Sequence, residues 1–203
     1  MSVMSGPSST GLVARVQNIL LRPAAEWDVI AAEPASVGSL YTGYACILAA
    51  IPAVASILGT LLFGRSLLVF GIVMAILTYV ISLVTVFVVA FIIDALATNF
   101  GAQKNQIQAL KLVVYSFTAS WVAGILDIVP ALGLIAALAG FYSLYLLYLG
   151  LPKLMLSPPD KTTGYFVVSL LIAIGVNVVL SWIVFLVGLS VGGAALMGAA
   201  AVH

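Results

Sequence analysis

Residues 67–93 read LLVFGIVMAILTYVISLVTVFVVAFII, a stretch without a single charged side chain. A helix needs about 20 mainly apolar residues to cross the hydrocarbon core of a bilayer, and this stretch exceeds that length. Inside lipid, backbone groups must be satisfied by one another, so an apolar run of this length is expected to be helical. The stretch therefore predicts a transmembrane helix.

Four further apolar runs share this character, and polar or charged residues separate them. They cover approximately residues 40–63, 107–126, 132–151 and 165–189. With residues 67–93 they predict an all-α, polytopic membrane protein of five transmembrane helices. Residues 37–203 then form one transmembrane domain, which follows an N-terminal segment of residues 1–36.

The overall composition agrees with a lipid environment. Of the 203 residues, 64% are apolar and only 6% are charged. Soluble domains carry about 25% charged residues, because they need polar groups at their surface. The net charge of +1 gives no electrostatic footprint for nucleic acid. The expected partners are membrane lipids, another membrane protein or a further copy of the chain.

The N-terminal segment contains a polar stretch, residues 10–35, that predicts two short helices divided at Pro23. In the first helix apolar side chains share one face, and Arg15 and Arg22 lie mostly opposite. In the second helix Trp27 lies beside acidic residues. Amphipathic helices of this kind lie in the headgroup plane. We therefore expect Arg15, Arg22 and Trp27 at the cytoplasmic membrane surface.

The basic residues predict the orientation in the membrane. With five spans and a cytoplasmic N-terminus, the C-terminus is periplasmic and the cytoplasmic side collects Arg15, Arg22, Lys104, Lys111, Lys153 and Lys161. Only Arg65 falls outside, which is a strong positive-inside bias. A four-span alternative, with the third and fourth runs as a re-entrant pair, would place Lys153 and Lys161 outside and is disfavoured.

Four stretches carry a resemblance to known proteins: NILLRPAAEWDVIAAEP (18–34), LYTGYACILAAIPA (40–53), FIIDALATNFGAQKNQIQALKLVVYS (91–116) and YSLYLLYLGLP (142–152). In this order they resemble the bacterial branch of the Yip1 family. The resemblance implies a five-span protein of the inner membrane with a cytoplasmic N-terminus. Eukaryotic relatives bind small GTPases, but their DLYGP-type motif does not occur here, so that role is not carried over.

Catalytic and metal-ligating residues are scarce. The only His is His203 and the only Cys is Cys46, too few for metal or thiol chemistry. Asp94 is expected at the cytoplasmic end of the second span and Asp127 at the periplasmic end of the third. A bilayer core of about 30 Å separates them, so they form no catalytic pair. We therefore expect no enzyme activity and no cofactor.

A layer of polar or helix-breaking residues is predicted near the bilayer midplane. Asn177 lies near the middle of the last run, and Pro52, Ser82 and Thr118 lie at similar depth in three others. Pro52 leaves the carbonyl of Leu48 without its helical donor. The layer is a candidate solute site, as in transporters with broken helices, or else a proline kink with an interhelical hydrogen bond.

Two patterns concern packing. Tyr142, Tyr145 and Tyr148 recur every third residue, which is typical of an aromatic belt and is also compatible with the lining of a cavity. Ala55 and Gly59 are separated by three residues, a spacing that permits close helix contact within the chain or between copies.

An ion pair is predicted between Asp94 and a lysine of the next helix. Asp94 lies near the C-terminus of its span and Lys111 near the N-terminus of the next, where the helix dipole disfavours each charge. Mutual pairing would offset both penalties. Lys104 is closer in sequence but nearer the apex of the loop, so it is expected to be hydrated.

Two function classes are compatible with these patterns. One is a membrane scaffold or adaptor that acts through helix packing and its cytoplasmic face. The alternative is a transporter or channel for a small solute or ion, with its site near Pro52 and Asn177. The absence of charge at mid-span disfavours a proton-coupled pump.

Overall fold

The computed structural model describes residues 11–64 and 67–200. Five helices are long and apolar enough to cross a membrane: Val37–Phe63, Leu68–Phe100, Gln106–Ile128, Gly133–Leu154 and Pro159–Ser190. The predicted all-α fold with five spans is confirmed, and the third and fourth spans both reach full length. Arg65, the predicted periplasmic charge, lies outside the described residues.

Several spans are built from more than one helical segment. The chain order is α1 (Leu12–Leu21), α2 (Pro23–Ala32), α3 (Val37–Leu40), the π-helical turn η1 (Tyr41–Ala45), α4 (Cys46–Phe63), α5 (Leu68–Leu96), the 3-10 turn η3 (Ala97–Phe100), α6 (Gln106–Ser116), α7 (Thr118–Ala123), the 3-10 turns η4 (Gly124–Ile128) and η5 (Pro130–Leu132), α8 (Gly133–Leu154) and α9 (Pro159–Ala200).

Local sequence explains where several of these segments begin and end. Pro23 occupies the first position of α2, where its missing N–H is tolerated. Ser36 caps α3, because its side chain accepts a hydrogen bond from the Ser39 N–H at 3.1 Å. The second span ends at Gly101, whose φ of 69° is a left-handed conformation that glycine adopts without strain.

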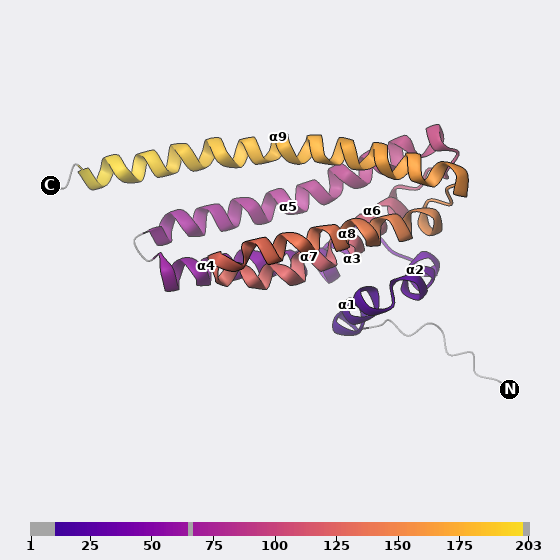
Figure 1. The fold of residues 1–203 in the computed structure, drawn as a ribbon, viewed down its shortest axis with the longest axis horizontal. Coiled ribbons are helices and arrows are strands. Elements are labelled where there is room, and N and C mark those ends of the chain that lie inside the picture. Colours follow the sequence, from indigo (N-terminus) through magenta and orange to yellow (C-terminus); the bar gives the residue numbers. More distant parts are fainter. Residues whose placement is uncertain (1–10, 65–66, 201–203) are drawn as a thin grey trace.

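The spans form an elongated bundle with α1 and α2 packed at one end. Figure 1 shows α9 beside α5 on one side, with α4, α7 and α8 on the other, and α1 and α2 below the end at which α8 joins α9. We call this the capped end and the opposite one the open end. Helices α8 and α9 approach each other near residues 155–158 and diverge toward the open end.

Burial differs greatly between the spans. In the third span 61% of the most apolar stretch is buried inside the protein, whereas in the fifth span none of it is. The third span is therefore the centre of the bundle, and α9 lies at its edge with α5 as its main neighbour. The buried core is richest near the capped end, where it includes Ile19, Trp27, Ile30, Leu112 and Leu151.

The predicted contact at Ala55 and Gly59 is confirmed, and it lies within the chain. A Cβ atom on Gly59 would come 2.7 Å from the carbonyl oxygen of Ile128, so α4 and η4 touch backbone to backbone there. The same two segments meet again at Pro52 of α4, where a Cβ on Gly124 of η4 would lie 2.5 Å from the proline Cβ. Small residues thus allow α4 to approach the third span closely.

Candidate functional site

The third span is interrupted at Phe117, near the middle of its length. Helix α6 ends at Ser116, and Phe117 has φ −72° and ψ −7° before α7 begins at Thr118. The Thr118 hydroxyl donates to the Tyr115 carbonyl at 2.7 Å, and the Ser120 N–H donates to the Ser143 hydroxyl at 3.2 Å. Side-chain hydroxyls thus bond within this turn, a known cause of helix distortion. The Phe117 N–H still donates to the Val113 carbonyl at 3.1 Å and the Trp121 N–H to the Phe117 carbonyl at 3.0 Å, so the interruption is confined to one residue.

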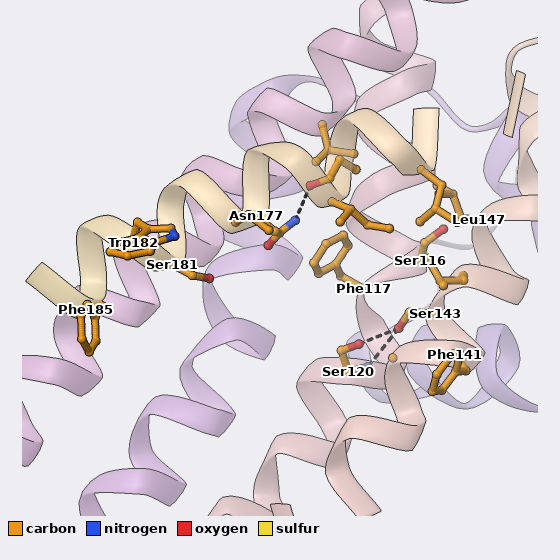
Figure 2. A pocket seen from close by; sticks show the side chains of 17 residues that line it. Ser116, Phe117, Ser120, Phe141, Ser143, Leu147, Asn177, Ser181, Trp182 and Phe185 are labelled. Atoms are coloured by element: carbon orange, nitrogen blue, oxygen red, sulfur yellow. Dashed lines mark hydrogen bonds between the residues drawn. The ribbon is translucent and has the colours of Figure 1, made fainter. Parts of the chain in front are cut away.

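A cluster of serine hydroxyls lies on one side of this break. The Ser120 and Ser143 hydroxyls are hydrogen-bonded at 2.8 Å and join α7 to α8. Ser116 is only 1% exposed, and its hydroxyl has no hydrogen-bond partner among the described residues. Figure 2 shows Ser120 and Ser143 facing each other, with Ser116 and Phe117 nearby.

These serines line a cavity of about 830 Å³. Its walls come from α5, α6, α7, α8 and α9, and α9 contributes Asn177, Ser181, Trp182 and Phe185. None of the described residues that line it is charged. Phe141, Trp182 and Phe185 are 71%, 59% and 53% exposed, so the cavity opens sideways at the surface of the bundle.

A smaller cavity of about 300 Å³ has walls from α5, α9 and Phe117. Phe117, Asn177 and Ser181 belong to the walls of both cavities. The Asn177 side chain donates to the Ala173 carbonyl of its own helix at 2.9 Å (Figure 2), which leaves its amide oxygen as an acceptor. Asn177 and Ser181 are therefore the polar residues common to the two spaces.

The four residues of the predicted midplane layer are only partly brought together. Ser82 lines the smaller cavity with Asn177 and accepts a hydrogen bond from the indole N–H of Trp121 at 3.1 Å. Thr118 is fully buried and accepts a hydrogen bond from Tyr44 at 2.8 Å. Pro52 packs on Gly124 and lines neither cavity. Pro52 and Asn177 therefore share neither of these two cavities, whereas Asn177 and Phe117 line both.

The three tyrosines of α8 do not line either cavity. Tyr142 donates to the carbonyl oxygen of Leu20 at 2.6 Å and so ties α8 to the end of α1. Tyr145 and Tyr148 are 49% and 39% exposed. One of the three therefore has a role in attaching the N-terminal helices that their spacing alone does not indicate.

Arg15 and Trp27, predicted at the membrane surface, are instead buried within the protein. Arg15 is 5% exposed and forms ion pairs with Glu26 and Glu33, the latter at 2.6 Å to Oε2. Burial alone would lower the pKa of Arg15, but the two carboxylates raise it above its ordinary value. Trp27 has no exposed surface. Arg22 alone of the three is exposed.

The Trp27 ring fills a space between α6 and α8. A Cβ atom on Gly150 would lie 2.7 Å from the indole and 2.6 Å from Leu112, so only glycine fits there. Tyr115 packs edge-on against Trp27 and against Tyr44, at ring-centre distances of 6.5 Å and 4.7 Å. The apolar face of α1 and α2 is therefore covered by protein rather than by lipid headgroups.

The predicted pair of Asp94 and Lys111 does not form in the described part of the chain. The Lys111 ammonium donates to the backbone carbonyls of Ile30, at 2.8 Å, and of Glu33. Gln108 adds a bond to the Ala31 carbonyl at 3.1 Å. These carbonyls end α2, where the helix dipole favours a cation, so Lys111 is satisfied by α2 instead of by Asp94.

Asp94 is itself buried, with 5% of its surface exposed and one carboxylate oxygen without a partner among the described residues. It lies next to Ile93, whose carbonyl accepts a hydrogen bond from Tyr165 of α9. Lys104 is exposed in the loop, as predicted. Within the described ranges no group of three or more His, Cys, Asp or Glu residues could hold a metal ion.

The described lining of the cavity combines neutral polar groups with apolar side chains. Its described polar groups are hydroxyls and one amide, which donate and accept hydrogen bonds but do not ionise near neutral pH. Aromatic and aliphatic side chains make up the rest of its walls. Such a combination can orient an uncharged ligand through single hydrogen bonds.

Comparisons with known proteins agree with this architecture. Residues 18–183 match the Yip1 domain. The chain is 28% identical over 178 residues to the inner membrane protein YohC of Escherichia coli strain K12, covering 82% of this chain and 90% of the relative. The YohC protein of strain O6:H1 matches to the same extent. No solved structure matches significantly. The chain therefore belongs to the Yip1 family of multi-pass membrane proteins.

Proposed function

We propose that this protein is a non-enzymatic carrier or receptor that binds an uncharged molecule within the membrane, in the cavity at the Phe117 break. The observation that carries the proposal is the buried Ser116 hydroxyl, which lines the cavity and lacks a partner among the described residues. An unsatisfied buried hydroxyl costs about 1–3 kcal/mol, so a ligand that bonds to it gains affinity.

The volume of the cavity supports the same function. Ligand pockets typically measure about 300–1,000 Å³ and combine apolar walls with a few polar groups. At about 830 Å³, with Ser116, Ser143 and Asn177 in its walls, this cavity has both properties. Transport of an inorganic ion is disfavoured, because the described lining offers no charged ligand.

Two glycines provide a matched test of whether the cavity binds anything. Gly140 lines the cavity and Gly175 does not, and a Cβ atom at either would meet nothing within 4 Å. Native mass spectrometry of the protein from mild detergent should show a bound molecule that Gly140→Leu removes and Gly175→Leu retains. Equal occupancy in the two variants would contradict the proposal.

A membrane scaffold is the second candidate, and the attachment of α1 and α2 favours it. Because buried contacts fix these helices, Val13 and Leu21, which are 67% and 79% exposed, form a rigid apolar surface. If this surface holds a partner, Val13→Ser with Leu21→Ser should reduce the size of the complex on native gels. Gly140→Leu should leave that size unchanged. A carrier predicts no change from the surface pair.

A further inference from the structure

We infer that the ligand is a neutral lipid whose polar part carries only uncharged oxygen groups, such as hydroxyls and carbonyls, and that it enters between α8 and α9. This inference rests on the proposed function and adds the chemical class and the route. It draws on four properties of the cavity: its charge, its depth, its opening and its unpartnered hydroxyl.

The charge of the lining excludes ordinary phospholipid headgroups. The described lining residues include five polar ones, Ser116, Ser120, Ser143, Asn177 and Ser181, all of them neutral. A phosphate would require a cation or several donors in this low-dielectric environment. Hydroxyl and carbonyl groups require only single hydrogen bonds, which serine can provide.

The depth of the polar groups limits the size of the ligand's polar part. Ser116 is near the middle of the span Gln106–Ile128, and Ser143 and Asn177 are near the middle of theirs. A group that binds there lies about 15 Å from either edge of a hydrocarbon core of about 30 Å. Only a lipid with a small uncharged polar group reaches that depth without a large desolvation penalty.

The opening of the cavity indicates how the ligand enters. Phe141 of α8 and Trp182 of α9 belong to its walls and are 71% and 59% exposed, on a surface that faces lipid in a membrane. Figure 2 shows these two side chains on opposite sides of the serine cluster. The hydrocarbon part of a lipid can remain in this opening while its polar group reaches Ser116.

The test uses the purified full-length chain in detergent and decylubiquinone as the probe. Quinones quench tryptophan fluorescence, and Trp182 lines the cavity. Quenching should be saturable in the wild type and in Gly175→Leu, and affinity should be about tenfold weaker in Gly140→Leu. Ser116→Ala should weaken affinity about fivefold, because one hydrogen bond is lost. Trp182→Phe should remove most of the quenching.

Competing lipids distinguish the sources of this chemistry. Dioctanoylglycerol should displace the quinone if a glycerolipid hydroxyl is sufficient for binding. If the quinone binds saturably and dioctanoylglycerol does not displace it, the ligand class is restricted to quinones. Dioctanoylphosphatidylglycerol, which is charged, should not displace it.

Two outcomes would overturn the inference: displacement by the charged lipid as strong as by the neutral one, or quenching that rises linearly without saturation in every variant. If native mass spectrometry nevertheless showed a cavity-dependent phospholipid, the role of the cavity as a binding site would stand, but the uncharged class of ligand would be wrong. Equal adducts in Gly140→Leu and Gly175→Leu would instead reject the proposed function.

Discussion

At the capped end Trp27 has no exposed surface, whereas Trp182, on the way to the open end, is 59% exposed. The first lies among α2, α6 and α8, where even a methyl group on Gly150 would not fit. The second lies on a helix whose most apolar stretch is not buried at all. The fifth span has a mean hydropathy of 2.7 and the third, which covers Trp27, only 1.5, so hydrophobicity alone does not determine how tightly a membrane helix packs against its neighbours.

The difference arises from polar contacts. At the capped end Arg15, Lys111 and Lys153 bond to carboxylates or backbone carbonyls of the N-terminal helices. In lipid, apolar surfaces gain little by leaving one apolar environment for another, so such bonds and close packing decide which helices associate. The edge helix α9 has fewer of them and leaves room for a cavity.

The largest effect on this comparison is expected from Arg15→Met. Removal of the guanidinium leaves Glu26 and Glu33 buried or half-buried without their cation, which typically destabilises a protein by about 3–5 kcal/mol. Thermal unfolding in detergent measures the loss. Arg22→Met, at an exposed position of the same segment, should change stability by less than about 0.5 kcal/mol. Similar losses in both variants would contradict the buried network.

The next effect is expected from Lys111→Met, which removes the cation from the end of α2. Hydrogen bonds from charged groups contribute about 1.5–3 kcal/mol, and a loss of this size is expected. Lys104→Met serves as the exposed control. In a double-mutant cycle, Lys111→Met and Asp94→Asn should be additive. A coupling energy above about 1 kcal/mol would instead support the ion pair between Asp94 and Lys111 that the sequence predicts.

A methyl group at Gly150 and one at Gly140 compare the packing of the two regions directly. Gly150→Ala should destabilise by about 1–3 kcal/mol, because the methyl overlaps Leu112 and Trp27. Gly140→Ala should be nearly neutral, because nothing lies within 4 Å of its Cβ position. Both variants can be measured by the same thermal unfolding assay. Equal effects would mean that the cavity is filled by protein.

Asn177→Leu should have a smaller effect on stability, below about 0.5 kcal/mol. The amide is exposed and bonds to its own helix, so no buried partner is left unsatisfied. Its effect should instead appear as reduced occupancy of the cavity in native mass spectrometry. A strongly destabilised variant would favour the purely structural role that the sequence left open.

The smallest change is spectroscopic. In bilayers that contain bromine-labelled acyl chains, Trp182 should be quenched and Trp27 should not, because one indole faces lipid and the other is enclosed by protein. Trp182→Phe should therefore remove most of the quenching. Persistent quenching in that variant would instead support the position of Trp27 at the membrane surface that the sequence predicts.

The spans could be predicted from sequence because length and apolarity are local properties, and residues 67–93 alone suffice for one of them. Lys111 could not be assigned in this way. Its partners on α2 are remote in the chain, and a positive charge within an apolar run indicates only that some partner exists. The last turn of α2 contains no basic residue of its own, which is the other half of that signal.

The cavity shows a similar limit. Asn177 and Ser82 were recognised because polar residues stand out in apolar runs, and they do line a common space. The sequence pattern does not predict that Pro52 lies away from Asn177 and packs against Gly124, because that contact depends on how two helices cross. The Phe117 break carries neither Pro nor Gly, and its only local signal is the hydroxyl residues beside it, Ser116, Thr118 and Ser120, which are also common inside regular membrane helices.

The bonds made by Lys111 and Lys153 have a consequence for how the chain is made. They connect residues 81 and 129 positions apart, so α2 leaves the ribosome long before the residues that bond to it. At about 5–20 residues per second, α2 waits several seconds before Lys111 is synthesised. During this interval Trp27 has neither α6 nor α8 to cover it. The attachment of α2 can therefore be completed only after the fourth span, which carries Lys153, has been synthesised.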